Sequence, residues 1–242
     1  MDLTRPDAAP GVSHDARTPA PLDDIEVLAA WRTSAAPWTA AVRGGAIESR
    51  RLVTDRAVVD AVLARAPGTA LDLGCGEGWL ARALAARGVR VTGVDAVPTL
   101  VEAARRQGGG DFRVASYEEV AAGALDLRVD VVVANFALIG GAAVDAVVQR
   151  VPALLAPGGA FVVQTLHPLV ATGDQPYADG WRPGSWAGFG PEFTHPAPWY
   201  FRTLGSWLRL LTESGLRLAE LREPVHPGTG RPASVVLVAT VD

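Results

Sequence analysis

A glycine-rich turn and a carboxylate that follows it carry the most informative chemistry in the sequence. Residues 69–78 read Thr-Ala-Leu-Asp-Leu-Gly-Cys-Gly-Glu-Gly, a short apolar run that breaks into three glycines. Glycine lets backbone N–H groups approach a bulky ligand, because it has no side chain to collide with the ligand. A second apolar run ends at Asp95, whose carboxylate can accept hydrogen bonds from both hydroxyl groups of a ribose. Together these features predict a site for a nucleoside-containing cofactor.

The spacing of the glycines separates two classes of cofactor. A dinucleotide site prefers Gly-x-Gly-x-x-Gly, in which the third glycine allows close packing of a helix on a strand. Here the glycines are Gly74, Gly76 and Gly78, and Trp79 occupies the third dinucleotide position. Asp72 precedes the turn, where a carboxylate would repel a pyrophosphate and would suit a cationic amino acid group. An NAD(P)-dependent oxidoreductase is therefore the alternative interpretation of this turn.

Residues 71–78 resemble the first motif of the class I S-adenosylmethionine-dependent methyltransferases, and Asp95 matches the acid with which that family binds the ribose. The resemblance implies an S-adenosylmethionine pocket and S-adenosylhomocysteine as the product. It also implies that Asp72 orients the loop and the ammonium group of the methionine moiety, and Arg50 is a candidate for its carboxylate. The other positions expected to contact the cofactor are Gly74, Cys75, Gly76, Gly78, Ala96, Ser116, Tyr117, Asn135 and Phe136.

Two departures from the patterns of the wider family bear on the ligands. The family often places an acid near the adenine amine, whereas this chain has Ser116 followed by Tyr117. Asn135 is followed by Phe-Ala-Leu and not by the Pro-Pro-Tyr or Pro-Pro-Phe typical of enzymes that methylate DNA bases or protein glutamine. The Asp-Asn pair of metal-dependent catechol methyltransferases is also missing. We therefore expect a small-molecule acceptor and no metal ion.

The segment after the last predicted parallel strand is dense in aromatic residues. Eight of them lie among 25 residues, namely Tyr177, Trp181, Trp186, Phe189, Phe193, Trp199, Tyr200 and Phe201. Such density among prolines and glycines is typical of a pocket wall or lid, although a small satellite core beneath a long loop would also explain it. We interpret residues 167–200 as a lid over a flat, largely apolar acceptor.

Methyl transfer needs in-line placement of the reactants, and an acceptor hydroxyl or N–H also needs a base. His167 follows the fifth predicted strand, at the edge where a parallel sheet presents catalytic groups. A His-Pro pair at this position resembles one that some family members use near the acceptor. His195 and Tyr177 are the other candidates, and the sequence leaves open which of the three, if any, is the base.

Alternating apolar runs and amphipathic segments predict the elements that would position these residues. Strands are expected at 69–73, 89–94, 111–115, 129–134 and 160–166, and helices at 50–66, 78–87, 98–107, 143–155 and 203–214. A short helix is expected to run from Asp23 toward Trp31 and to break at residues 34–37, Ser-Ala-Ala-Pro. Runs at 216–221 and 234–241 predict a terminal hairpin. The predicted fold is α/β: a doubly wound, mostly parallel seven-stranded sheet with a helical N-terminal segment and an antiparallel C-terminal hairpin.

Composition bounds the remaining possibilities. The chain has 242 residues, 49% of them hydrophobic and 20% charged, which fits one methyltransferase domain over 22–242 after a disordered tail over 1–21. All 22 basic residues are Arg and the net charge is −4, so the sequence holds no Schiff-base or P-loop lysine and no basic stripe for nucleic acid. Without a signal peptide or membrane span, a cytoplasmic monomer or homodimer is expected. A catalytically silent S-adenosylmethionine-binding protein is a second alternative.

Overall fold

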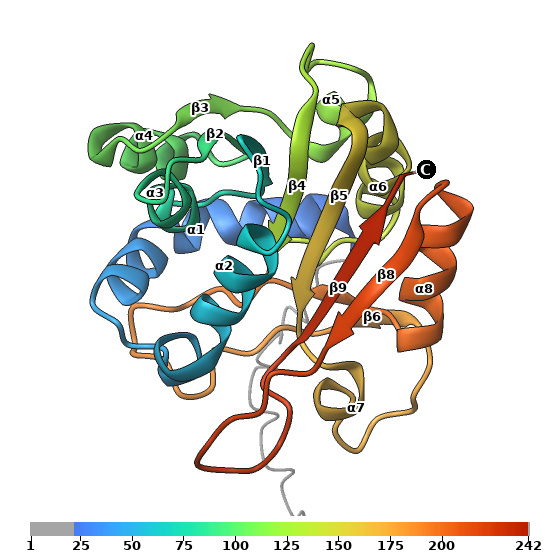
Figure 1. Ribbon diagram of the computed structural model, residues 1–242. Coiled ribbons are helices and arrows are strands. Elements are labelled where there is room, and N and C mark those ends of the chain that lie inside the picture. The colour runs from blue at the N-terminus through green and yellow to red at the C-terminus, as the bar shows by residue number, and fades with distance from the viewer. Residues whose placement is uncertain (1–21, 242) are drawn as a thin grey trace, which may run out of the picture.

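The computed structural model describes residues 22–241, and a seven-stranded sheet runs through the middle of this part (Figure 1). The strands lie in the order β3-β2-β1-β4-β5-β9-β8, and β9 runs antiparallel to both of its neighbours. Their bounds are β1 (Thr69–Leu73), β2 (Arg90–Asp95), β3 (Asp111–Val114), β4 (Val129–Asn135), β5 (Leu155–Thr165), β8 (Arg217–Arg222) and β9 (Val235–Thr240). The predicted mixed sheet and its terminal hairpin are confirmed. The predicted tail, residues 1–21, lies outside the described residues.

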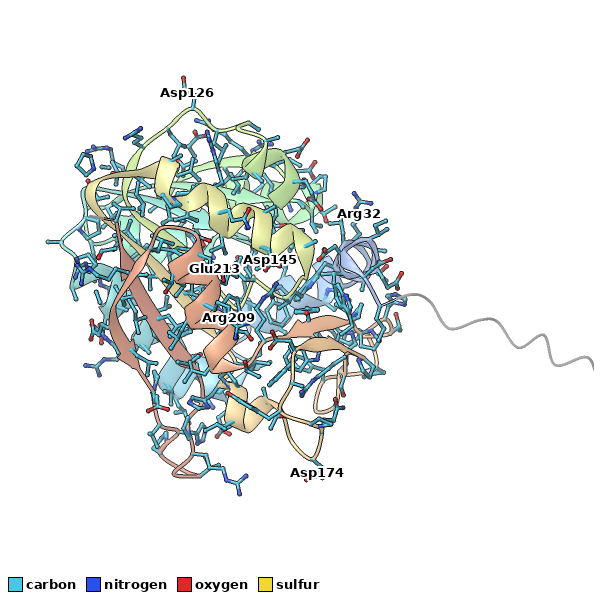
Figure 2. All side chains as sticks on the ribbon, turned by 90° about the vertical axis from the view of Figure 1, so that its right-hand side faces the viewer. Arg32, Asp126, Asp145, Asp174, Arg209 and Glu213 are labelled. Carbon is cyan, nitrogen blue, oxygen red and sulfur yellow. The ribbon has the colours of Figure 1, made fainter. Side chains whose placement is uncertain are left out.

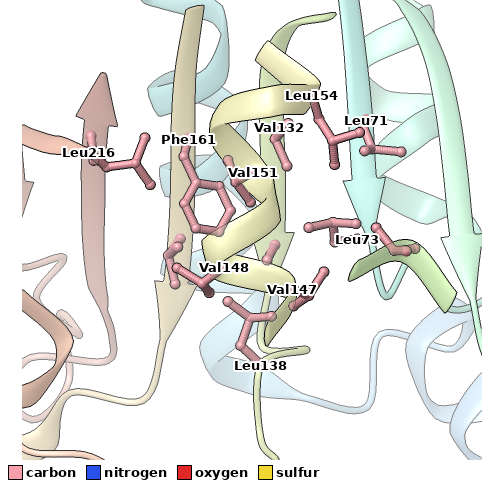
Figure 3. Close-up of a cluster of buried hydrophobic side chains, with 14 of the residues drawn as sticks. Leu71, Leu73, Val132, Leu138, Val147, Val148, Val151, Leu154, Phe161 and Leu216 are labelled. Atoms are coloured by element: carbon pink, nitrogen blue, oxygen red, sulfur yellow. The ribbon is translucent and has the colours of Figure 1, made fainter. Parts of the chain in front are cut away.

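Helices cover both faces of the sheet. Their bounds are α1 (Asp24–Arg43), η1 (Arg50–Thr54), α2 (Asp55–Leu63), α3 (Trp79–Ala85), α4 (Pro98–Gln107), α5 (Tyr117–Ala121), α6 (Ala142–Leu154), α7 (Pro168–Ala171) and α8 (Leu204–Glu213). Figure 1 shows α5, α6 and α8 on one face and α2, α3 and α4 on the other. In Figure 3, α6 lays Val148 and Val151 against Phe161 of β5. The central strands read as continuous apolar runs because both of their faces are buried.

Helix α1 does not break where the sequence predicted a break. It continues from Asp24 to Arg43 with Pro37 inside it. A proline in a helix removes one hydrogen bond and crowds the preceding turn. Here tertiary packing compensates, since Trp31, Ala35 and Trp38 share one helix face and pack against Val97 and Leu100. The helix therefore spans both sides of the residue that was expected to end it.

The lid, residues 167–200, is more regular than the sequence indicated. It begins with the short helix α7, and β6 (Gly180–Arg182) pairs antiparallel with β7 (Trp199–Phe201). The amide of Tyr200 in β7 donates to the carbonyl of Ile139, 2.7 Å away, in the loop that follows β4. The lid is thus joined to the carboxyl edge of the sheet. Within residues 22–241, no helix is long and apolar enough to cross a membrane.

Candidate active site

A cavity of about 530 Å³ opens at the carboxyl ends of β1, β2, β4 and β5. Its walls come from the glycine loop, helix α1, the loop after β4 and the lid. Of the residues predicted to contact the cofactor, those that line it are Arg50, Gly74, Cys75, Gly76, Asp95, Ala96, Ser116, Tyr117, Asn135 and Phe136. Asp72 and Gly78 are not among the residues that line it. The edge predicted from the sequence is therefore where the cavity lies.

The glycine loop needs glycine for two different reasons. Gly74, Gly76 and Gly78 have φ angles of 72°, 56° and 84°, a backbone region that other residues rarely adopt. A Cβ at Gly74 would overlap Ala137 and the Tyr117 hydroxyl, whereas the space beside Gly76 is open. The loop thus combines a left-handed turn with a close approach between backbone segments.

Asp95 holds the glycine loop and lines the cavity. One carboxylate oxygen accepts from the Gly76 amide at 2.9 Å, and the other accepts from the Val97 amide at 2.9 Å. Burial raises the pKa of Asp95, and these two backbone hydrogen bonds oppose the rise. Each carboxylate oxygen has a further lone pair, so the side chain can still accept hydrogen bonds from ligand hydroxyl groups.

Asp72 is a buried acid with a strongly raised pKa, two residues before the first glycine of the loop. It lies in β1 within the core at 2% exposure, and its Oδ2 has no hydrogen-bond partner within the described part of the chain. Burial, with a smaller contribution from the charge of Asp95, raises the pKa of Asp72 from 3.8 to about 7. A buried carboxylate without a cationic partner is costly. Asp72 would therefore be stabilised in its charged form by a cation bound in the cavity.

Arg50 provides a buried cation in the same cavity. It stands in η1, a π-helical turn, and its Nε donates to Asp55 at 2.9 Å. Its guanidinium lies 4.6 Å from the centre of the Trp79 ring. Nη2 is buried and has no hydrogen-bond partner among residues 22–241. Because an unpaired buried N–H donor is unfavourable, Nη2 is suited to receive a ligand carboxylate.

The residues that follow β3 and β4 shape the wall near these charged groups. Ser116 caps α5, with its Oγ accepting from the Glu119 amide at 3.2 Å. The Tyr117 hydroxyl donates to the Ala137 carbonyl at 3.1 Å. Phe136 has φ of 52°, a conformation that non-glycine residues adopt mainly where the surroundings impose it, often at functional sites. Burial raises the pKa of the Cys75 thiol, which disfavours a nucleophilic thiolate at this position.

The sequence patterns did not identify two buried residues that have clear structural roles. Glu77, at 1% exposure, receives two contacts of 2.7 and 2.8 Å from Arg82 and one of 2.8 Å from Arg43 of α1. This arrangement ties α1 to the glycine loop. Gln164, also at 1% exposure, donates to Asn135. An acid inside the loop could have drawn attention to Glu77, but Gln164 carries no local signal.

The other half of the cavity is aromatic. Trp31 and Trp38 of α1 meet Trp186 of the lid, with ring centres 6.0 and 6.4 Å apart respectively. The aromatic residues that line this half are Trp31, Trp38, Trp186, Phe189, Trp199, Tyr200, Phe201 and Trp207. Phe193 instead packs behind Trp186 at 4.8 Å and is buried. Aromatic residues of this segment therefore both line the cavity and pack into a small core, and its role as a lid over the acceptor stays a prediction.

None of the three predicted catalytic side chains is among the residues that line the cavity. His167 is buried, and its Nε2 lies 2.7 Å from Glu223 on the connection between β8 and β9. The exposed His195 pairs with Glu26 of α1 at 2.6 Å. The Tyr177 hydroxyl accepts from the Leu204 amide at 2.9 Å. In this arrangement all three fasten the lid to other elements, and a role as base stays a prediction.

The fold and the site define a class I S-adenosylmethionine-dependent methyltransferase. A family model described as "Methyltransferase domain" matches residues 48–221. The chain belongs to this family. It is 32% identical over 176 residues to a ubiquinone biosynthesis O-methyltransferase of Methylobacterium sp. (strain 4-46), covering 67% of this chain and 66% of that protein. A protein of the same name from Xanthomonas oryzae pv. oryzae (strain PXO99A) is 35% identical over 114 residues, 45% of this chain and 47% of the relative.

The chain thus spans between about half and two thirds of these curated relatives. Among solved structures, a Burkholderia thailandensis 1,6-didemethyltoxoflavin-N1-methyltransferase aligns with a TM-score of 0.65 at 21% identity, covering 95% of this chain and 98% of that one. An S-adenosylmethionine-dependent methyltransferase from Mesorhizobium loti aligns with a TM-score of 0.58 at 24% identity, over 75% and 95% of the two chains. At these identities the likeness establishes the fold.

Proposed function

We propose that this protein transfers the methyl group of S-adenosylmethionine to a small, planar, largely apolar molecule. The observation that carries the proposal is the unpartnered, buried Nη2 of Arg50 at a cavity that Asp95 also lines, with the unpartnered, buried Oδ2 of Asp72 two residues before the first glycine of the loop in its wall. The methionine part of the cofactor is a zwitterion, with an ammonium group for Asp72 and a carboxylate for Arg50. Asp95 supplies the acceptor for the ribose hydroxyls. The chain's own residues therefore fit the charge pattern of this cofactor.

The aromatic half of the cavity supports a flat acceptor. Planar rings pack on aromatic faces with little loss of conformational freedom. The relatives and the solved structure described above bear the names of a ubiquinone biosynthesis O-methyltransferase and a 1,6-didemethyltoxoflavin-N1-methyltransferase. These names are consistent with a small acceptor, and oxygen, nitrogen and carbon nucleophiles are all compatible with the sequence of this chain.

Methyl transfer requires the protein chiefly to position the two reactants. The bound cofactor supplies an activated methyl group on its sulfonium. Packing of Trp31, Trp38 and Trp186 around the acceptor excludes water and limits its orientation. Holding the nucleophile in line, about 3–3.5 Å from the carbon, supplies much of the acceleration. The new bond to carbon forms as the carbon–sulfur bond breaks, and an acceptor O–H or N–H also loses its proton.

Calorimetry with S-adenosylhomocysteine tests the cofactor half of the proposal. Asp95→Ala should weaken binding by at least about tenfold, because a charge-assisted hydrogen bond contributes about 1.5–3 kcal/mol. Arg50→Met should weaken it to a similar extent, whereas Arg51→Met, a change at the exposed neighbouring residue, should not. Binding of NAD(P) in place of S-adenosylhomocysteine by the wild-type protein would refute the proposal.

The acceptor half requires a screen with isotopically labelled S-adenosylmethionine. Planar phenols, quinols and nitrogen heterocycles should yield S-adenosylhomocysteine and a labelled product, while flexible aliphatic acceptors of equal size should not. Binding of the cofactor without turnover of any compound in the screen would favour a catalytically silent binding protein. We further propose a cytoplasmic monomer or homodimer that does not bind nucleic acid, and the net charge of −4 supports the last of these points.

A further inference from the structure

A buried chain of hydrogen bonds leads from the core to the cavity wall. Gln164 of β5 donates from its Nε2 to the Thr54 carbonyl at 2.9 Å and to Asn135 Oδ1 at 2.7 Å. The Ser234 hydroxyl donates to Gln164 Oε1 at 3.4 Å. Gln164 and Ser234 are 1% and 0% exposed, while Asn135 lines the cavity. The chain thus joins segments far apart in the sequence and ends at the site.

The Thr54 carbonyl determines the orientation of the side-chain amide groups of Gln164 and Asn135. A main-chain carbonyl only accepts hydrogen bonds, so the atom of Gln164 that faces it must be the nitrogen. That nitrogen also faces Asn135, and therefore Asn135 must present its Oδ1 to Gln164. The reverse orientation would place the Gln164 oxygen against two other oxygens inside the core. Asn135 is left with its Nδ2, which has no protein partner within residues 22–241, on the side away from Gln164.

The position of Asn135 gives this orientation a consequence for the ligands. Asn135 ends β4, and β4 lies between β1, which carries the glycine loop, and β5, which leads into the lid. At the carboxyl edge of the sheet, the end of β4 therefore lies between the glycine loop and the segment that leads into the lid. We infer that Asn135 presents an N–H donor at the junction of the two halves, and that Gln164 is the positioning residue that keeps it a donor.

This inference rests on the proposed function and narrows its acceptor class. A fixed donor favours an acceptor with a lone pair beside the reacting atom, such as a carbonyl, a phenolate or a ring nitrogen. The same donor disfavours an acceptor that presents an ammonium or N–H group at this point, because two donors would then face each other.

A pair of cofactor analogues tests the inference without knowledge of the acceptor. Sinefungin carries an amino group where the cofactor carries the S-methyl group, and S-adenosylhomocysteine carries nothing there. Calorimetry of both ligands gives the ratio of their dissociation constants for each variant. Asn135→Asp keeps an oxygen toward Gln164 and replaces the donor by a carboxylate oxygen. Its preference for sinefungin over S-adenosylhomocysteine should rise at least about tenfold, the size of one charge-assisted hydrogen bond.

A second variant separates positioning from direct contact. Gln164→Leu releases the Asn135 amide, which can then turn its oxygen toward the amine, so the preference for sinefungin should rise about threefold, a fraction of a hydrogen bond. In the double variant Asn135→Asp with Gln164→Leu, the change at Gln164 should add nothing, because both ends of a carboxylate are oxygen. Gln107→Leu, the same substitution at an exposed position, is the matched control, and thermal unfolding checks that each variant folds.

The possible failures can be told apart. If the wild-type protein binds neither analogue, the proposed function itself is wrong. If both analogues bind and Asn135→Asp leaves their ratio unchanged, the donor does not face the ligand and the inference is overturned. Equal effects of Gln164→Leu in the wild-type protein and in the Asn135→Asp variant would show that Gln164 acts on general stability and would also overturn its positioning role. Should Gln164→Leu fail to fold, Gln164→Met, which keeps the length of the side chain without its amide group, takes its place in both comparisons.

Discussion

Replacement of Asp72 by asparagine should stabilise the ligand-free protein at neutral pH. The folded protein keeps a proton on this buried side chain up to a pKa of about 7, whereas the unfolded chain releases it near 3.8. Between these values the unfolded state binds fewer protons, so the free energy of unfolding falls as the pH rises. The slope is about 1.4 kcal/mol per pH unit. An asparagine side chain is uncharged and has a similar shape, so the variant should escape this loss.

Urea unfolding at pH values from 5 to 8 measures the effect. The stability of Asp72→Asn relative to the wild type should grow by about 3 kcal/mol over that range, following the slope of about 1.4 kcal/mol per unit up to pH 7. Asp126→Asn is the control, since Asp126 is exposed on the loop before β4 (Figure 2). Parallel stability profiles for the wild type and Asp72→Asn would refute the assignment of an unpaired buried carboxylate.

Asp72→Asn should also weaken the binding of the cofactor. A ligand ammonium group favours the charged form of Asp72, so binding of S-adenosylhomocysteine to the wild type should tighten by up to about tenfold per pH unit as the pH rises toward 7. Asp72→Asn should bind more weakly at pH 8 and lose this pH dependence. If Asp72→Asn gained stability and kept full affinity for S-adenosylhomocysteine, Asp72 would have no role in binding the cofactor.

Three further perturbations test other parts of the site. Glu77→Gln should lower the free energy of unfolding by about 3 kcal/mol or more, because two arginines lose a buried carboxylate; urea unfolding checks this, and a loss below about 1 kcal/mol would contradict it. Trp199→Ala should raise KM for a planar acceptor at least about tenfold and leave the affinity for S-adenosylhomocysteine nearly unchanged, as expected for the loss of a large aromatic contact that the lid makes with the acceptor. His167→Gln, which can retain a hydrogen bond to Glu223, should preserve turnover if His167 only fastens the lid, whereas a loss of about a hundredfold or more with unchanged stability would establish it as the base.

Many residues at the carboxyl edge of the sheet could be predicted from local patterns in the sequence. The run of residues 69–78 combines a buried strand with glycines that few other residues could replace, and these requirements act over a few neighbouring positions. Gly74, Cys75 and Gly76 of the loop accordingly line one cavity with Asp95 and Asn135, whereas Gly78 does not. The break expected at Pro37 was wrong, because aromatic packing of α1 outweighs the local cost of proline.

The sequence by itself determined the fold class and the cofactor edge, since periodicity and turn chemistry depend on residues that are close along the chain. Only the tertiary structure decided which side chains reach the ligands. His167 pairs with Glu223, 56 residues away, and the Asn135 amide is oriented through Gln164 by the Thr54 carbonyl. No pattern in the neighbouring sequence predicts these partners. Their roles depend on hydrogen bonds that form once distant segments pack and exclude water, and only the packed chain brings those segments together.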